Sequence, residues 1–261
     1  MALAGYDLKL DYGDAAAEAR RCRSDCALFD FSFLEGARLE GERAQGVIER
    51  FTGRPLQALG IGEIFYALRL NERGLVSADW TIWRTGDRSF EVMSGRREDV
   101  LDLLACAGPG IAVADVTADR VAFALQGPRT LDVLRKLGDA AAIEALRYFT
   151  FTRATLAGIP CTVGRLGYTG ELGVEIIAER EQGAALWRAL SAHAAPAGFI
   201  AADMLRIEAG FVLFTHEFGL PVSAHEAGLG KFGRPTESLT PEIELVSFRA
   251  AADVLVLPWR P

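Results

Sequence analysis

The sequence predicts an α+β protein of two interleaved domains, each a mainly antiparallel sheet covered on one side by helices. Three observations predict this class. Segments with strand alternation follow one another in hairpin-like pairs, segments with helical periodicity separate these pairs, and no clear linker divides the chain. Of the 261 residues, 50% are hydrophobic and 24% are charged, which is enough apolar chain for a sizeable core.

The first half of the chain begins with two helical segments. Residues 14–25 are rich in Ala, Glu and Arg, which favour a helix. Ala44, Val47, Ile48 and Phe51 recur at i, i+3, i+4 and i+7, the spacing of a helix face that packs against a core. The elements expected next are a strand over 64–70, a turn over 71–74, a strand over 76–84, a turn over 85–87, a strand over 89–93 and a helix around 100–104.

The second half repeats this alternation. Pro128 is suited to the first turn of a helix that extends to residue 137. Met204, Ile207, Glu208 and Phe211 fall on one helical face. The other expected elements are a strand over 121–125, a hairpin of 149–156 and 161–166 that turns around 158–160, a strand over 174–177 and a helix over 181–194.

After Gly228 the character of the sequence changes. Residues 230–241 are polar and turn-rich, and only residues 243–248 have the pattern of a strand. This is too little chain for another domain. The sequence therefore predicts one large region over 1–230, built from the two interleaved subdomains, and a short tail over 231–261.

Charge and hydropathy narrow the classes of function. The net charge is −7, and no basic run offsets it, so a nucleic-acid partner is not expected. The N-terminus has no secretory pattern, and no apolar run is long enough for a membrane helix, which needs about 20 residues. The four scattered cysteines suit a reducing compartment. We therefore expect a cytoplasmic protein without a membrane partner.

Metal sites and common catalytic motifs receive little support. Cys22 and Cys26 are four residues apart, but two thiols make only half a zinc site and no other ligand is near in sequence. The three histidines form no pair at i, i+4, and the dinucleotide, P-loop and nucleophile-elbow motifs are absent. We expect no bound metal.

Three segments stand out from this background: Ala124–Pro128, Gly167–Glu175 and Asp203–Gly210. Each has a plain structural interpretation when taken alone. The first is a strand-to-helix turn, the second is a glycine-rich loop before a strand, and the third is a helix. In that helix, Arg206 and Glu208 are either exposed or paired.

In this order and spacing the three segments resemble the aminomethyltransferase (glycine-cleavage T-protein) family. Residues 26–32, residues 71–74 with Asp79 after them, and residues 226–230 also fit, so the resemblance covers about residues 20–230. That family folds as three domains around a central folate site, with two interleaved α+β domains and a C-terminal β-barrel. The resemblance implies the same central cleft here, tetrahydrofolate as cofactor, and a tail in place of most of the barrel.

The resemblance also assigns roles to three residues. Asp79 matches an aspartate beside the reactive nitrogens of folate, where a carboxylate stabilises the charge that develops during one-carbon transfer. Glu175 matches the glutamate that accepts the paired N–H and amino groups of the pterin. Tyr168 is placed to stack on the ligand or to hydrogen-bond near it. The structural alternatives are a solvated strand-end acid, an exposed strand glutamate and a packed tyrosine.

Two sites depart from the family pattern, and a further position separates the chain from one branch of folate-binding relatives. Ala202 replaces an arginine that would hold an acidic part of the cofactor. Residues 32–34 read Ser-Phe-Leu in place of Ser-His-Met. Gly167 stands where folate-binding relatives in iron–sulfur assembly or RNA modification carry a cysteine, which argues against that branch. The first two departures put the amine-releasing reaction on a lipoyl arm in doubt more than folate binding itself.

The leading hypothesis is a tetrahydrofolate-dependent transferase that moves an aminomethyl or methyl group. The donor is an aminomethyl-lipoyl arm on a carrier protein, an N-methyl amine or an O-methyl compound. The alternative is a non-catalytic folate-binding, scaffold or regulatory protein on the same fold. Because a missing barrel leaves one side of the cleft open, we also expect a homo-oligomer or a partner subunit that covers it.

Overall fold

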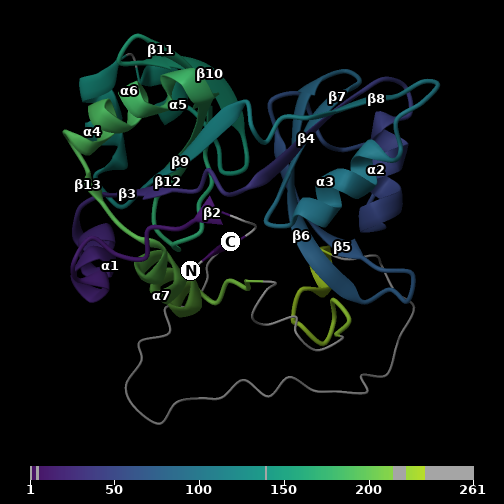
Figure 1. Cartoon of the computed structure of the whole chain (residues 1–261), viewed down its shortest axis with the longest axis horizontal. Coiled ribbons are helices and arrows are strands. Elements are labelled where there is room, and N and C mark those ends of the chain that lie inside the picture. Colours follow the sequence, from purple (N-terminus) through teal and green to yellow (C-terminus); the bar gives the residue numbers. More distant parts are fainter. Residues whose placement is uncertain (1, 4–5, 139, 214–221, 233–261) are drawn as a thin grey trace.

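The structure is a computed structural model that describes residues 2–3, 6–138, 140–213 and 222–232. Within these residues the chain forms two large sheets that stand side by side, each with its own helices (Figure 1). The predicted α+β class is confirmed. The expected tail lies outside the described residues except at its start, where residues 230–232 form the short helix η1 (Gly230–Phe232).

The first sheet has six strands and is antiparallel except at one edge. Its central strand, β9, is buried along its whole length. Only the short pair at the edge, β3 with β13, is parallel. The strand order is β10 (Phe151–Leu156), β11 (Ile159–Gly164), β12 (Gly173–Glu179), β9 (Arg120–Gln126), β3 (Ala27–Asp30) and β13 (Ala195–Pro196).

The second sheet has five strands and is antiparallel throughout. Helices α2 (Ala44–Thr52) and α3 (Arg97–Leu104) cover one of its faces, and their apolar side chains share a core with Trp80 and Ile82. The strand order is β5 (Ile64–Leu70), β6 (Val76–Gly86), β7 (Ser89–Ser94), β4 (Glu35–Glu40) and β8 (Ala112–Asp115).

Helices cover both faces of the six-stranded sheet, so the expectation of a single covered face is wrong for this unit. On one face the core includes residues of α4, α5 and α6, and on the other it includes residues of α1 and α7. The unbroken burial of β9 is the local sign of this arrangement. The helices are α1 (Ala15–Ser24), α4 (Thr130–Leu137), α5 (Ala141–Glu144), α6 (Arg180–Ser191) and α7 (Phe199–Ala209).

The two units are interleaved along the chain, as predicted. Strand β3 belongs to the six-stranded sheet, residues 35–115 build the second unit, and β9 returns the chain to the first. Residues 222–232 then lie against the second unit again, because Ser223 forms a bridge with Leu75 before β6. The N-terminal pair β1 (Ala2–Leu3) and β2 (Tyr6–Asp7) forms a separate small sheet.

Two local expectations need correction. The hairpin between β10 and β11 turns at Ala157 and Gly158, whose φ angles are 50° and 79°, and not around residues 158–160. A two-residue turn with both φ angles positive matches the twist of the strands, so Pro160 already pairs inside β11. Helix α7 ends at Ala209 and Gly210 adopts a left-handed φ, so Phe211 lies beyond the helix.

A small apolar cluster joins the two sheets directly. Ile64, Trp83 and Met93 come from the five-stranded sheet, and Ala122 and Ile177 come from the six-stranded sheet. The sheet faces that carry these residues therefore face each other. On the five-stranded sheet, side chains that share this face are turned toward the six-stranded sheet, whereas on the six-stranded sheet the part of the face around Ala124 packs under α1 and α7.

Candidate active site

Asp79 lies on the side of β6 that faces the six-stranded sheet. Along this strand Trp80 and Ile82 point to the helices α2 and α3, whereas Trp83 belongs to the cluster between the sheets. Side chains alternate along a strand, so Asp79 shares the face of Trp83. The two are four positions apart, which places Asp79 about 13 Å farther along the interface.

Tyr66 holds Asp79 in place. Its hydroxyl donates a hydrogen bond of 3.0 Å to Oδ2 of Asp79 from the neighbouring strand β5. Burial raises the pKa of Asp79 to about 6, and the hydrogen bond from Tyr66 partly opposes that shift. Tyr66 was not predicted as a site residue from the sequence. The available signal was its place on the strand paired with β6, diagonal to Asp79.

Glu175 lies on the facing side of the six-stranded sheet. Its neighbours Val174 and Ile176 point into the core under α4 and α6, whereas Ile177 belongs to the cluster between the sheets. Glu175 is only 8% exposed, so the alternative of an exposed strand glutamate is wrong. Burial alone raises the pKa of this carboxyl group to about 7. Within the described part of the chain, no charge or hydrogen bond offsets that burial.

The strand that carries Asp79, β6, packs against β11, the neighbour in the sheet of the strand that carries Glu175. Glu175 pairs with Gly164 on β11, and the tip of the Trp83 ring lies 2.3 Å from where a Cβ on Gly164 would stand. A side chain at position 164 would therefore prevent the packing of β6 against the strand pair. The structure places Asp79 and Glu175 on facing surfaces of one interface, offset along it. Their contact with a common ligand stays a prediction.

Tyr168 is largely occupied by contacts within the protein. Its hydroxyl donates a hydrogen bond of 2.5 Å to the backbone oxygen of Val212, and its ring stacks on Phe211 with centroids 6.1 Å apart. It also lies near Tyr66, since it is one of the groups that raise the pKa of Tyr66, after burial and Asp79. The geometry matches a packed loop tyrosine at the border of the Tyr66–Asp79 pair, and its contact with a cofactor stays a prediction.

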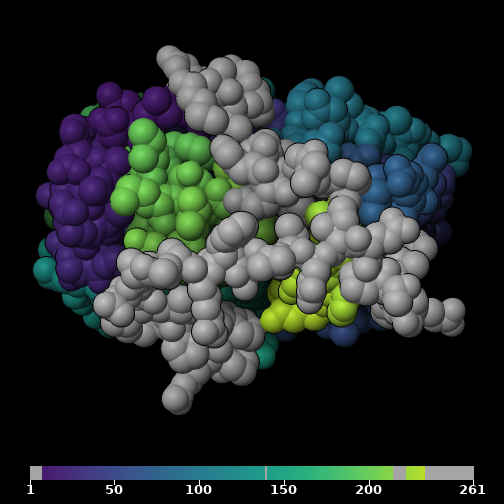
Figure 2. Space-filling model, turned by 90° about the horizontal axis from the view of Figure 1, so that it is seen from below, coloured from purple at the N-terminus to yellow at the C-terminus, as the bar shows by residue number. Residues whose placement is uncertain are grey.

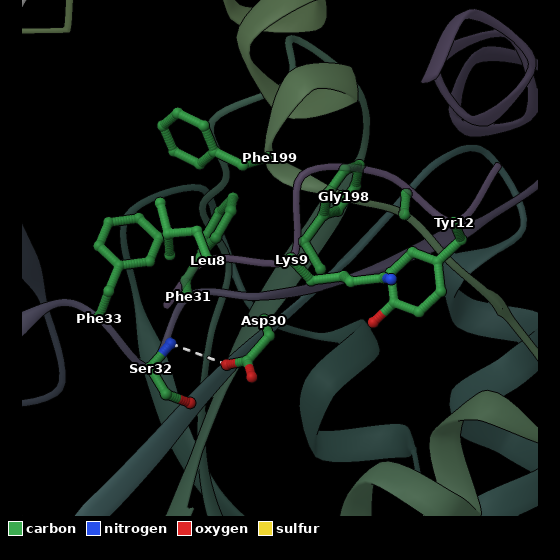
Figure 3. Close-up of a pocket in the computed structure, with 11 residues that line it drawn as sticks. Leu8, Lys9, Tyr12, Asp30, Phe31, Ser32, Phe33, Gly198 and Phe199 are labelled. Carbon is green, nitrogen blue, oxygen red and sulfur yellow. Dashed lines mark hydrogen bonds between the residues drawn. The ribbon is translucent and has the colours of Figure 1, made fainter. Parts of the chain in front are cut away.

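A separate cavity lies near the N-terminal segment, away from these acids (Figure 3). Phe31, Phe33 and Phe199 line one side of it, and Asp30 accepts a hydrogen bond of 2.9 Å from the backbone N–H of Ser32. Its volume is about 130 Å³. Pockets for cofactor-sized molecules are about 300 Å³ or larger, so this cavity is too small for folate.

The three segments singled out in the sequence meet in space. The side-chain amide of Gln126 donates hydrogen bonds of 3.2 Å to the backbone oxygens of Leu166 and Val174, and Thr169 donates one of 2.9 Å to its oxygen. The first segment is thereby fixed to the second. Gln126 is fully buried, so each of these bonds satisfies a group that water does not reach.

Arg23 of α1 joins the third segment to the second. Its guanidinium donates to the backbone oxygen of Thr169 and to the carboxylates of Glu171 and Glu208, at 2.9, 2.9 and 2.7 Å. Arg206 is buried and paired with Asp203 at 2.8 Å. Glu208 is paired with Arg23, so Arg206 and Glu208 both have structural roles. The three segments thus form one network that positions the loop before β12, the strand of Glu175.

Comparison with known proteins agrees with this arrangement. A family model described as the GCVT N-terminal domain matches residues 2–235. The chain belongs to this family. The aminomethyltransferase of Streptomyces avermitilis is 32% identical over 238 residues, which cover 87% of this chain and 63% of the relative. The aminomethyltransferase of Aquifex aeolicus is 31% identical over 231 residues, which cover 88% of this chain and 63% of the relative. This chain spans about 63% of the length of these relatives.

A solved structure supports the same assignment. The crystal structure of glycine cleavage system aminomethyltransferase T from Bartonella henselae matches with a TM-score of 0.72 and 28% sequence identity. The match covers 82% of this chain and 59% of that chain. The resemblance to the aminomethyltransferase family, predicted from the motifs, is therefore confirmed for this member of the GCVT family.

The glycine at position 167 of this GCVT-family chain has a clear packing reason. A Cβ there would stand 1.9 Å from the side-chain oxygen of Gln126. Gln126 is held by three hydrogen bonds and cannot move without losing them. A cysteine therefore does not fit at this position, which agrees with the expectation that the chain differs from the cysteine-bearing relatives.

Among the described residues, the cysteines and possible metal ligands form no further catalytic or metal site. Cys22 and Cys26 are both buried and free, and burial raises their pKa values to about 12 and about 11, which makes them poor nucleophiles. In the described ranges, no group of three or more His, Cys, Asp and Glu side chains is arranged to hold a metal ion. No helix there is long and apolar enough to span a bilayer.

Proposed function

We propose that this GCVT-family protein transfers an aminomethyl or methyl group to or from tetrahydrofolate, with Asp79 and Glu175 in one site. One observation carries the proposal: two desolvated carboxylates lie on facing surfaces of the interface between the two sheets. Carboxylates with strongly raised pKa values are concentrated at functional sites, which supports this assignment. The site belongs to a folate-binding region over residues 1–230, and the proposed location is the cytoplasm.

Glu175 is suited to bind the pterin ring. A pterin presents an N–H and an amino group side by side, and a carboxylate accepts both as a bidentate pair. Glu175 fits this role because it is buried and its charge is not compensated within the described residues. Binding two donors favours the ionised form, so the ligand would offset the cost of burial that raises the pKa to about 7.

Asp79 is suited to the reacting end of the ligand. When bound, tetrahydrofolate supplies the nitrogens that accept or release the one-carbon unit. A carboxylate beside those nitrogens stabilises positive charge and accepts a proton as the unit is transferred. The pKa of Asp79, about 6, leaves it mostly ionised at neutral pH, and Tyr66 fixes the orientation of its carboxylate.

The one-carbon donor remains one of three classes: an aminomethyl-lipoyl arm on a carrier protein, an N-methyl amine or an O-methyl compound. Support for the first comes from the relatives, which are aminomethyltransferases, and one belongs to a glycine cleavage system. A lipoyl-carrier protein is therefore the first partner to assay.

Folate binding is the first test of the proposal. Calorimetric titrations of the protein with tetrahydrofolate and with its 5-formyl form should each show saturable binding of one ligand per chain. The same titration with Gly164→Phe should show little binding, because a large side chain there would displace Trp83 and separate the facing sheets. Absence of binding to a wild-type protein with a cooperative unfolding transition would contradict the proposal.

A second candidate function is a non-catalytic folate-binding, scaffold or regulatory role. The observation that favours it is Ala202, which stands where the family commonly has an arginine. It is 1% exposed and packed among the side chains of α1 and α7, so an arginine has no room there in this chain. Folate binding without turnover on any of the three donor classes would favour this candidate.

We also propose that a second copy or a partner subunit covers part of this protein. Ile200, Met204 and Ile207 form an exposed stripe along α7, with exposures of 40%, 36% and 58%. Figure 2 shows α7 in green at the surface, beside the N-terminal residues in purple. Sedimentation at micromolar concentration should give a mass above that of a single chain, and the Ile207→Glu variant should give a lower mass. A monomer that binds folate tightly would rule out the self-association version.

A further inference from the structure

Arg54 follows α2 and lies at the free edge of the five-stranded sheet. Its Nη1 donates a hydrogen bond of 2.6 Å to the backbone oxygen of Tyr66 on the edge strand β5. Its guanidinium also stacks over the ring of Phe65, with the carbon of the guanidinium 3.8 Å from the ring centroid. These two contacts fix the side chain in one orientation and leave most of its N–H donors available.

Arg54 is connected to the site through aromatic contacts. The ring of Phe232 lies 5.6 Å from the guanidinium of Arg54 and meets the ring of Tyr66 edge-on, with centroids 5.0 Å apart. Tyr66 in turn donates a hydrogen bond from its hydroxyl group to Asp79. A continuous chain of contacts therefore connects Asp79 through Tyr66 and Phe232 to Arg54.

The charge of Arg54 has no acidic partner among the described residues. Burial lowers its pKa, and no carboxylate raises it. Other arginines of the same unit behave differently: Arg69 pairs with two aspartates, and Arg97 pairs with Glu35 and Asp115. A half-buried cation without a counter-charge is costly, so an anion at this position would stabilise the protein.

We propose that Arg54 binds a carboxylate at the glutamyl end of folate, an inference that rests on the proposed function. Tyr66 fixes the position of Asp79 relative to Arg54, because its hydroxyl contacts Asp79 and its backbone oxygen contacts Arg54. Folate has a matching order of groups: a benzoyl ring separates its reacting nitrogens from its carboxylates. Phe232 and Tyr66 offer that ring an aromatic surface, and the guanidinium fork pairs with a carboxylate.

The test compares two ligands that differ only in the glutamyl group. Binding of 5-formyltetrahydrofolate and of 5-formyltetrahydropteroate, which lacks glutamate, is measured by calorimetry for wild type, Arg54→Gln and Arg54→Lys. Arg54→Gln should weaken binding of the folate about tenfold, as expected for one charged hydrogen bond, and leave the pteroate unchanged. Arg54→Lys keeps the charge but lacks the guanidinium fork, so its affinity for the folate should lie between those of wild type and Arg54→Gln.

Two controls separate folding from binding. Arg88→Gln removes an exposed arginine paired with Glu42 and should leave both affinities at the wild-type level. Equal losses for the two ligands in Arg54→Gln, or no loss for either, would overturn the role of Arg54 while the proposed function stands. If wild type binds neither ligand, the proposed function itself is wrong, and the role of Arg54 is wrong with it.

Discussion

Replacement of Glu175 by glutamine is expected to stabilise the protein at pH 8 and to weaken folate binding strongly. The buried carboxyl group has its pKa raised from 4.5 to about 7 by burial. The folded state therefore holds this proton more tightly than the unfolded state, and the free energy of unfolding falls as pH rises from about 4.5 to 7. Glutamine keeps the shape of the side chain and removes the charge.

The size of this effect follows from the shift in pKa. From pH 5 to pH 8, the stability of Glu175→Gln relative to wild type should increase by about 2 kcal/mol. Chemical denaturation at both pH values measures it. Glu181→Gln, at the exposed start of α6, is the matched control and should show no such change with pH. Equal stability of Glu175→Gln and wild type at both pH values would show that the carboxylate carries no burial penalty.

Folate binding should respond in the opposite direction. The ionised form of Glu175 accepts the pterin donors, so affinity in wild type should rise between pH 6 and pH 8, through the pKa of about 7. In Glu175→Gln the affinity at pH 8 should fall by about 100-fold, since two charge-assisted hydrogen bonds are lost. Stability gained together with binding lost is typical of a residue kept for function.

Asp79→Asn should lower turnover far more than folate affinity. Asparagine retains an oxygen that accepts the hydrogen bond of Tyr66, so the geometry of the site persists. It cannot stabilise the charge that develops in the transition state or accept a proton. We expect kcat to fall by about 100- to 10,000-fold, while the dissociation constant of 5-formyltetrahydrofolate changes only a few-fold.

The matched control for this variant is Asp87→Asn, in the exposed turn between β6 and β7. Its kcat and folate affinity should equal those of wild type in the same assay, with an aminomethylated lipoyl carrier as donor. Loss of affinity in parallel with kcat would make Asp79 a binding group. Unchanged kcat in Asp79→Asn would remove it from the reaction.

Local patterns in the sequence predicted most of the individual elements. The spacing of Ala44, Val47 and Ile48 matches the buried side of α2, and the alternation over 64–70 is β5. Strand β3 was not predicted because it has only four residues, and β4 was not predicted because it lacks clear alternation, as its continuous burial from Glu35 to Ala37 shows. Such strands are defined by their partners in the sheet and not by their own sequence.

The motif resemblance predicted two acids as site residues but did not predict their surroundings. Asp79 and Glu175 were identified by position, whereas Tyr66 and Arg54 depend on contacts across strands and with the distant Phe232. Met204 and Ile207 were assigned to one helix face correctly, yet that face is exposed and the opposite face of α7 is buried. Periodicity identifies a face, but only tertiary packing decides which side is buried.

The most direct measurement of the central claim is a crystal structure of the protein with 5-formyltetrahydrofolate. The ligand should lie at the interface between the two sheets. Its pterin N–H and amino groups should bind Glu175, and its N5 side should lie beside Asp79. A ligand bound elsewhere, such as in the cavity lined by Phe31 and Phe199, or one that contacts neither acid, would contradict the assignment of Asp79 and Glu175 to a folate site.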